Sequence, residues 1–446
     1  MRLRLRLQET LFLDAPPRPP LTPARIAAGL GLAAVGVVAI CLRLGLSTSF
    51  HSLWAEDGTI LLETAVRHDF LTSAGTLYVG NVILVPRLVG EIAGAAPLSW
   101  APAIFTIAGN AIVVGCAFIV WTASAAHIRD PFLRAALAAL VVIVPVAGLE
   151  SIDNTDYVAF YMLFATFWLL LWRPRSAIAA GAGGAFGLLT ALCTPLGAVL
   201  VPLAALRMIA ARDRRDWLVA APLVAGAVAQ LVTYELHRSA APPSGWDWST
   251  FEAYLQRVLA GGLFGQRIAG GLWEIGGWVF LAILGMTAAA LAAFALGRPS
   301  RRGRDFLILA LILSLGTFVV SAYARDVGAA MVWPAGSYNS TTGPRYAIMP
   351  VLLLVSAVLV QLDLGPARER PRVQIACSAG FLALLVAGAV TSFSVADREA
   401  RGTPSWPSAL AAARQSCAPP QAPTATIPIS PPGWTTTLPC SDVRAN

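Results

Sequence analysis

The stretch around Trp54, Glu56 and Asp57 carries the side chains best suited to chemistry. Two adjacent carboxylates follow the first long apolar segment and lie beside an indole. A carboxylate at the boundary between water and membrane can act as a general base and take the proton from an acceptor hydroxyl. The indole offers a flat apolar face for a sugar ring. The alternative is structural, because acidic residues also interact favourably with the dipole at a helix N-terminus.

Arg87 is the second candidate, within an apolar stretch that we expect to lie at membrane depth. An arginine there needs a partner, and a lipid phosphate is one. The alternative is a structural pair with Glu91, one helical turn further on.

A third cluster is an acidic loop between two apolar segments. It contains four polar candidates for substrate binding: Glu150, Asp153, Asn154 and Asp156. The loop borders Tyr157 and Tyr161, whose helical spacing would let them line a polar cavity. A loop that is simply solvated is the other interpretation.

Arg345 and Tyr346 form the fourth candidate, at the start of a late apolar segment. A guanidinium offers two parallel hydrogen bonds to a phosphate ester. The alternative is an arginine–tyrosine pair that anchors a helix at the membrane interface. The long polar loop before Arg345 favours a binding site.

The elements that position these residues are membrane helices. Of the 446 residues, 57% are hydrophobic and 13% charged, with a mean hydropathy of +0.68, which indicates a polytopic, all-α membrane protein. We expect about eleven transmembrane helices, at 24–46, 101–124, 134–149, 157–172, 176–193, 195–211, 217–236, 272–296, 305–323, 345–362 and 373–393.

The arginines give these helices an orientation. With eleven spans, the short basic loops fall on one side, which the positive-inside rule assigns to the cytoplasm. We therefore expect three regions: a cytoplasmic arm (1–23), a transmembrane domain (24–393) and an external tail (394–446). Residues 47–97 form the first external loop, where interfacial helices are expected around 54–66 and 78–96. The net charge of +8 is thereby explained by topology, and we expect no nucleic-acid partner.

Cysteines and motifs narrow the chemistry further. Cys417 and Cys440 lie in the polar tail and are predicted to form a disulfide, which requires an oxidising compartment. The spacing of cysteine and histidine predicts no metal site. No phosphate-binding Walker motif occurs, which argues against ATP-driven transport.

This pattern resembles the GT-C superfamily of integral-membrane glycosyltransferases. The resemblance consists of Trp54, Glu56 and Asp57 at the start of the first external loop, the interrupted helix around Arg87, and Arg345 with Tyr346 at the head of a late span. It implies a GT-C-like fold in which Asp57 or Glu56 is the general base. It also implies that Arg345 binds the lipid phosphate of a polyprenyl-phosphate sugar. A clean Asp-X-Asp motif is missing from the first loop, so no metal cofactor is expected, although a divalent metal is not excluded.

The resulting hypothesis is an inverting glycosyl transfer in a bacterial inner (cytoplasmic) membrane. The partners would be membrane lipid, the polyprenyl-phosphate-linked sugar and an extracytoplasmic acceptor, which is a glycan, a lipid or a protein. Two other classes remain open: a transporter or flippase of a lipid-linked sugar, and a non-catalytic protein of envelope assembly. Transporters often contain repeated halves and carry their charges in mid-span, and neither feature occurs in this sequence.

Overall fold

The computed structural model describes residues 2–445 except 15, 17–19, 21, 238–246, 298–299, 335–342, 365–370, 396–401 and 419–421. Six of its helices are long and apolar enough to cross a membrane: Pro23–Leu44, Leu98–Ala126, Arg214–His237, Gln266–Leu296, Arg301–Arg325 and Arg345–Asp363. They contain α2 (Pro23–Leu44), α7 (Ala101–Ala123), α12 (Arg214–His237), α15 (Gln266–Leu296), α16 (Arg301–Arg325) and α18 (Arg345–Asp363). The chain is therefore a helical membrane protein, as predicted.

Shorter apolar helices of 10–17 residues coincide with the other predicted spans. They are α8 (Pro131–Ile143), α9 (Val158–Leu171), α10 (Ala177–Ala191), η5 (Pro195–Leu200) continued by α11 (Val201–Ile209), and the part Ile375–Thr391 of α19 (Pro371–Thr391). A helix of 14 residues is about 21 Å long, less than the roughly 30 Å of a bilayer core. The total of eleven spans therefore stays a prediction.

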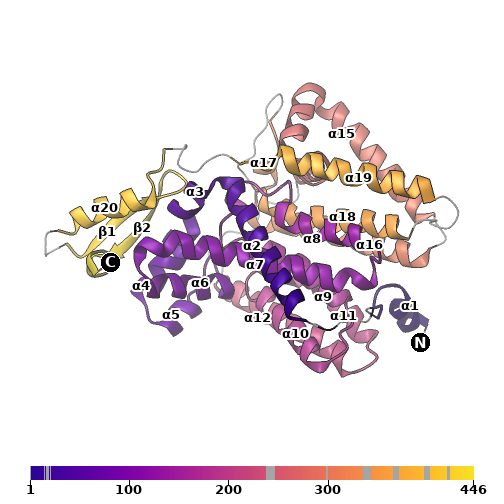
Figure 1. Cartoon of the computed structure of the whole chain (residues 1–446), viewed down its shortest axis with the longest axis horizontal. Coiled ribbons are helices and arrows are strands. Elements are labelled where there is room, and N and C mark those ends of the chain that lie inside the picture. Colours follow the sequence, from indigo (N-terminus) through magenta and orange to yellow (C-terminus); the bar gives the residue numbers. More distant parts are fainter. Residues whose placement is uncertain are drawn as a thin grey trace.

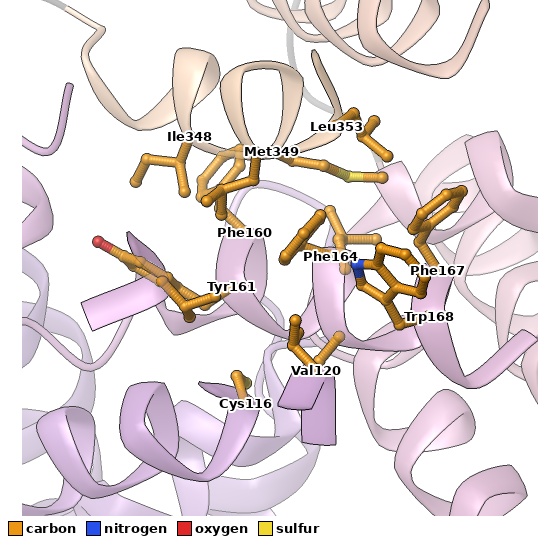
Figure 2. Packing of buried hydrophobic residues seen from close by; sticks show 14 of the residues in the cluster. Cys116, Val120, Phe160, Tyr161, Phe164, Phe167, Trp168, Ile348, Met349 and Leu353 are labelled. Carbon is orange, nitrogen blue, oxygen red and sulfur yellow. The ribbon is translucent and has the colours of Figure 1, made fainter. Parts of the chain in front are cut away.

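Helix α9 is the centre of the bundle. All of its residues are buried, as expected for a helix that is apolar on every side. It packs between α7 and α18, with Phe164, Phe167 and Trp168 against Val120 on one side and Met349 on the other (Figure 2). This packing places the N-terminal ends of α9 and α18 side by side, which matters for the site described below.

The segment predicted to be the first external loop consists of short helices instead of a span. They are α3 (Leu46–His51), η1 (Asp57–Leu62), α4 (Glu63–Arg67), α5 (Phe70–Gly75) and α6 (Leu84–Ala95). η1 is a π-helical turn, a widened turn that often occurs at functional sites. The 12 residues of α6 extend only about 18 Å, so this interrupted segment is too short to cross the bilayer, as the charge pattern predicted.

The C-terminal tail forms a small unit at one end of the molecule, and the N-terminal helix lies at the other end (Figure 1). The tail contains α20 (Trp406–Ser416), β1 (Thr424–Ile429), β2 (Trp434–Pro439) and α21 (Cys440–Ala445). The two strands pair antiparallel, and the predicted disulfide between Cys417 and Cys440 is confirmed.

The predicted N-terminal arm is packed against the bundle. Helix α1 (Arg2–Thr10) pairs with α16 through Arg6 and Asp305, and Leu11 and Phe12 are buried behind it. The remaining short elements are η2 (Leu98–Trp100), η3 (Ser124–Ala126), η4 (Leu149–Ser151), α13 (Trp248–Ala253), η6 (Tyr254–Ala260), α14 (Gly261–Phe264) and α17 (Gly328–Met331).

Candidate functional site

Six separate parts of the chain meet at a cavity with an empty volume of about 750 Å³. They are the start of η1, the segment before α6, the start of α9, the turn between α10 and η5, and the facing ends of α16 and α18. The polar side chains that line the cavity are Glu56, Tyr78, Asn81, Asp156, Tyr157, Thr194, Ser321, Arg325, Arg345 and Tyr346. Its apolar lining includes Ile83, Phe160 and Leu196.

Glu56 is the cavity carboxylate that the segment between α2 and α7 supplies. The residue is buried, with 8% of its surface exposed. Its Oε1 accepts a hydrogen bond of 2.8 Å from the hydroxyl of Tyr157. Its Oε2 is buried and has no hydrogen-bond partner among the described residues. One oxygen is thus held in place by Tyr157, and the other is not engaged by any described residue.

Asp57, the neighbouring carboxylate, does not line the cavity. It is 1% exposed, and its Oδ1 accepts a hydrogen bond of 3.3 Å from the backbone N–H of Thr155. The bond joins η1 to the segment before α9. The structure therefore separates two candidates that the sequence left equivalent: Glu56 lines the cavity, whereas Asp57 lies between two chain segments.

Asp156 is a second carboxylate of the cavity. Its pKa is raised from the ordinary 3.8 to about 7, mainly by burial and next by the negative charge of Glu56, whereas Arg345, Arg325 and Arg87 oppose the shift. Its own N–H donates to the Oδ1 of Asn154 at 2.9 Å. Near neutral pH this side chain can therefore both hold and release a proton.

Arg345 and Tyr346 lie on the wall formed by α18, as expected from the packing of α18 against α9. Arg345 pairs with Glu150 and donates a hydrogen bond of 3.1 Å to the hydroxyl of Tyr346. Its guanidinium carbon lies 4.5 Å from the ring centroid of Tyr157. Burial raises the pKa of Glu150, and Arg345 opposes this effect. Glu150 does not line the cavity itself, but it holds Arg345, which does.

Arg325, at the end of α16, is the charged residue that the sequence analysis did not select for the site. It lines the cavity, is exposed, and has no ion pair or hydrogen bond to another described residue. A signal was present, since Arg325 and Asp326 end an apolar helix on the side where the other polar clusters lie. The positive charge of Arg325 is available to an anion, whereas that of Arg345 is already paired with Glu150.

Trp54 and Arg87 lie outside the cavity lining. Trp54 is buried, and its backbone forms an isolated β-bridge with Ser430 of the tail. Arg87 is 1% exposed, and its Nη1 donates to the backbone oxygen of Ile60. This bond ties α6 to η1, so Arg87 supports the loop that carries Glu56. The sugar-stacking and phosphate-binding roles considered for these two residues are not supported by their positions.

Asp153 and Asn154 form part of the frame behind the site. Asp153 has a positive φ of 53°, and its carboxylate accepts hydrogen bonds from Ser49 at 2.5 Å and from Asn110 at 2.6 Å. These contacts connect the loop to α3 and α7. Asn154 is buried and turns the chain toward Asp156.

The cavity is lined by tyrosines and not by the indole of Trp54 that the sequence suggested. Tyr157 lines it, as considered from the sequence, whereas the ring of Tyr161 lies in the apolar core (Figure 2). Tyr78 and Asn81 were not selected from the sequence, and only their place in the interrupted segment before α6 pointed to them. Among the described residues, no group of three or more His, Cys, Asp or Glu is placed to hold a metal ion.

No protein-family model matches the chain, and no curated protein does. Two solved structures are similar to it. One is the crystal structure of the Archaeoglobus fulgidus oligosaccharyltransferase in complex with Zn and sulfate, with a TM-score of 0.40 and 14% identity, covering 88% of this chain and 55% of that chain.

The other is the archaeal oligosaccharyltransferase AglB from Archaeoglobus fulgidus in complex with an inhibitory peptide and a dolichol-phosphate. It has a TM-score of 0.37 and 13% identity, with coverage of 88% of this chain and 58% of that chain. The chain thus spans little more than half the length of both neighbours.

Proposed function

We propose that the protein is a membrane glycosyltransferase that moves a sugar from a polyprenyl-phosphate donor to an acceptor hydroxyl at the extracytoplasmic face. The observation that carries this proposal is a cavity with a buried, half-satisfied carboxylate, Glu56, and two arginines, Arg325 and Arg345. A proton acceptor and an anion-binding wall in one cavity are what a displacement with an anionic leaving group requires.

In this mechanism, Glu56 takes the proton from the acceptor hydroxyl as its oxygen attacks the anomeric carbon of the sugar. The bond between that carbon and the phosphate oxygen breaks, and its electron pair leaves with the polyprenyl phosphate. Attack from the face opposite the phosphate inverts the anomeric configuration. Glu56 ends protonated and returns its proton to solvent.

The arginines stabilise the negative charge that develops on the leaving phosphate. Preorganised donors have their largest effect at such a position. Arg325 supplies an unpaired guanidinium, and Arg345 supplies one that its contacts with Glu150 and Tyr346 hold in place. The hydroxyl of Tyr157 orients the Glu56 carboxylate. No step in this scheme needs a metal ion.

The site lies at the membrane surface, where a polyprenyl chain can stay in the bilayer while its phosphate enters the cavity. The charged residues of the cavity all come from helix ends or connecting segments on one side of the bundle. The opposite side carries the arginine-rich loop 212–215, which assigns that side to the cytoplasm.

The direct test is incubation of the purified protein with polyprenyl-phosphate monosaccharides carrying glucose, mannose or arabinose, followed by measurement of released or transferred sugar. We expect the wild type to turn over the donor and Glu56→Gln to abolish this turnover. Turnover that is unchanged in Glu56→Gln would refute Glu56 as the base. For the orientation, a cysteine introduced into loop 212–215 is expected to react with a membrane-impermeant thiol reagent only after the cells are opened.

A further inference from the structure

The C-terminal tail holds the main chain on both sides of Glu56. The backbone oxygen of Ser430 accepts a hydrogen bond of 2.5 Å from the N–H of Ala55, and the N–H of Ser430 donates one of 2.9 Å to the oxygen of Leu53. On the other side, the hydroxyl of Thr436 donates a hydrogen bond of 3.0 Å to the oxygen of Gly58. The backbone is thus bonded to the tail one residue before and two residues after Glu56.

Further contacts extend this attachment along η1 and α4. The hydroxyl of Thr59 donates to the oxygen of Thr435 at 2.6 Å. The carboxylate of Glu63 accepts a hydrogen bond of 2.7 Å from the N–H of Thr437. Both contacts come from β2, so one strand follows the whole widened turn that begins at Asp57.

The tail and the loop also share an apolar core. Leu53, Leu61 and Leu62 of the loop belong to the same buried cluster as Ile427, Ile429 and Leu438 of the tail. A Cβ atom added at Gly58 would lie 2.5 Å from the Cδ1 of Ile429, so only glycine allows this close approach without a shift of the neighbouring side chain. The disulfide joins the ends of α20 and β2, which keeps this surface of the tail in one shape.

We propose that Thr436 is a positioning residue for the reaction, which acts through Gly58 to hold Glu56 at the cavity. Thr436 is completely buried, whereas Thr426 and Thr435 of the same two strands are exposed. Its hydroxyl has a specific acceptor on the turn that carries the base. General bases need this support, because small displacements of a reacting group reduce the rate strongly.

The test compares Thr436→Val with Thr436→Ser in the full-length protein, using the polyprenyl-phosphate monosaccharide that the wild type turns over. Valine keeps the size and branching of threonine but removes the hydroxyl. We expect Thr436→Val to lower kcat about tenfold, with the donor KM changed less than twofold, because one hydrogen bond is lost and the base is displaced. Thr436→Ser is expected to restore most of kcat.

Thr426→Val is the matched control, because Thr426 lies on the neighbouring strand and its side chain is exposed. It is expected to leave kcat unchanged. Equal losses in Thr436→Val and Thr426→Val, or a loss that serine does not restore, would overturn the positioning role. Thr59→Val removes an independent contact of the same strand, and a smaller loss of kcat in this variant would support the role if Thr436→Val fails to fold.

The positioning role rests on the proposed function, so we add a second measurement that does not depend on activity. Hydrogen–deuterium exchange of residues 53–62 is expected to become faster in Thr436→Val and to stay unchanged in Thr426→Val. If the wild type turns over no polyprenyl-phosphate monosaccharide, the proposed function fails, whereas faster exchange in Thr436→Val still shows that the tail holds the loop. If Glu56→Gln leaves turnover intact, Glu56 is not the base and the positioning role fails with it. If Glu56→Gln abolishes turnover and Thr436→Val has the kcat and exchange of the wild type, only the positioning role fails.

Discussion

Charged side chains gather at both ends of the helical bundle, and the two groups differ in how their charges are paired. At the end opposite the tail, the carboxylate of Asp216 accepts hydrogen bonds from Arg173 at 2.8 Å and from Arg207 at 3.1 Å. Asp14 accepts one of 3.0 Å from Arg173 and another of 3.0 Å from Arg212. At the cavity, Arg345 pairs with Glu150, but the Oε2 of Glu56 and the guanidinium of Arg325 have no partner among the described residues.

We interpret the first group as a structural cluster and the second as the candidate functional site. Buried charges are costly, and pairing with hydrogen bonds offsets the cost. In the arginine cluster each buried charge has an oppositely charged partner, although the Nε of Arg207 lacks a hydrogen bond, and the pairs join α11, α12 and the N-terminal segment. Glu56 at the cavity has no such charge partner among the described residues, and charged groups that are kept unpaired in a cleft are typical of sites that bind or transform a ligand. We therefore expect substitutions at the cavity to affect activity and substitutions in the cluster to affect stability.

The largest effect is expected for Glu56→Gln, which keeps the size of the side chain and removes the proton acceptor. Transfer should fall by about 10²- to 10⁴-fold, the contribution typical of a general base, with an unchanged melting temperature. Glu9→Gln, at an exposed position at the opposite end, serves as the control. Asp57→Asn should lose less than about tenfold in rate, and a larger loss than in Glu56→Gln would exchange the roles of the two carboxylates.

Asp216→Ala should be the most destabilising change in the arginine cluster. It leaves Arg207 and Arg173 without their shared acceptor, and their side chains are only 1% and 10% exposed. Loss of one partner in a buried pair costs about 3–5 kcal/mol, which denaturant or thermal unfolding of the purified protein would detect. Asp213→Asn, in a half-exposed pair with Arg215, should cost less than about 1 kcal/mol. Equal costs for both variants would contradict a buried network.

Arg325→Ala tests the unpaired charge of the cavity. We expect the donor KM to rise about tenfold because a charged hydrogen bond to the phosphate is lost, while the melting temperature stays that of the wild type. Arg267→Ala, an exposed arginine outside the cavity lining, should change neither quantity. Arg345→Ala should lower the melting temperature as well, because it leaves Glu150 buried without its partner. A destabilised Arg325→Ala variant would show that Arg325 is structural.

The last expected effect is a change of stability with pH that comes from Asp156. Its pKa is raised to about 7, so the stabilising contribution of its bound proton is present below pH 3.8 and is lost as the pH rises through 7. Asp156→Asn should flatten the dependence of melting temperature on pH between 4 and 7. The pH dependence that comes from Asp213 has the opposite sign. Its hydrogen bond with Arg215 lowers the pKa of the Asp213 carboxyl, so its contribution to stability is lost as the pH falls. An unchanged pH profile in Asp156→Asn would contradict the raised pKa.

The elements that carry the site could be predicted from the sequence with little tertiary information. Apolar length and helical periodicity predicted the long helices, and Pro86, Arg87 and Glu91 showed that α6 was not a span. Two cysteines in a polar tail predicted the disulfide. These features depend on local composition, which the chain carries in every conformation.

The choice of residues within the site depended on tertiary packing. Glu56 and Asp57 are neighbours of the same type, but successive residues at the start of a helix point in directions roughly 100° apart, so only one of them lines the cavity. The residues that flank Arg345 favour it as the anion ligand. In the structure, however, its guanidinium pairs with Glu150, which lies 195 positions away in the sequence. Arg325 became a candidate because the ends of α16 and α18 meet.

The sequence by itself determined that this chain enters a membrane, which segments become helices and on which side their polar ends gather, because hydrophobic length and arginine placement act locally. Only the tertiary structure decided which charges are paired, because pairing requires residues distant in the chain to come within about 4 Å. It also showed that the tail reaches back to the turn that holds Glu56. That contact joins Thr436 to Gly58, 378 positions apart, and no local pattern predicts it.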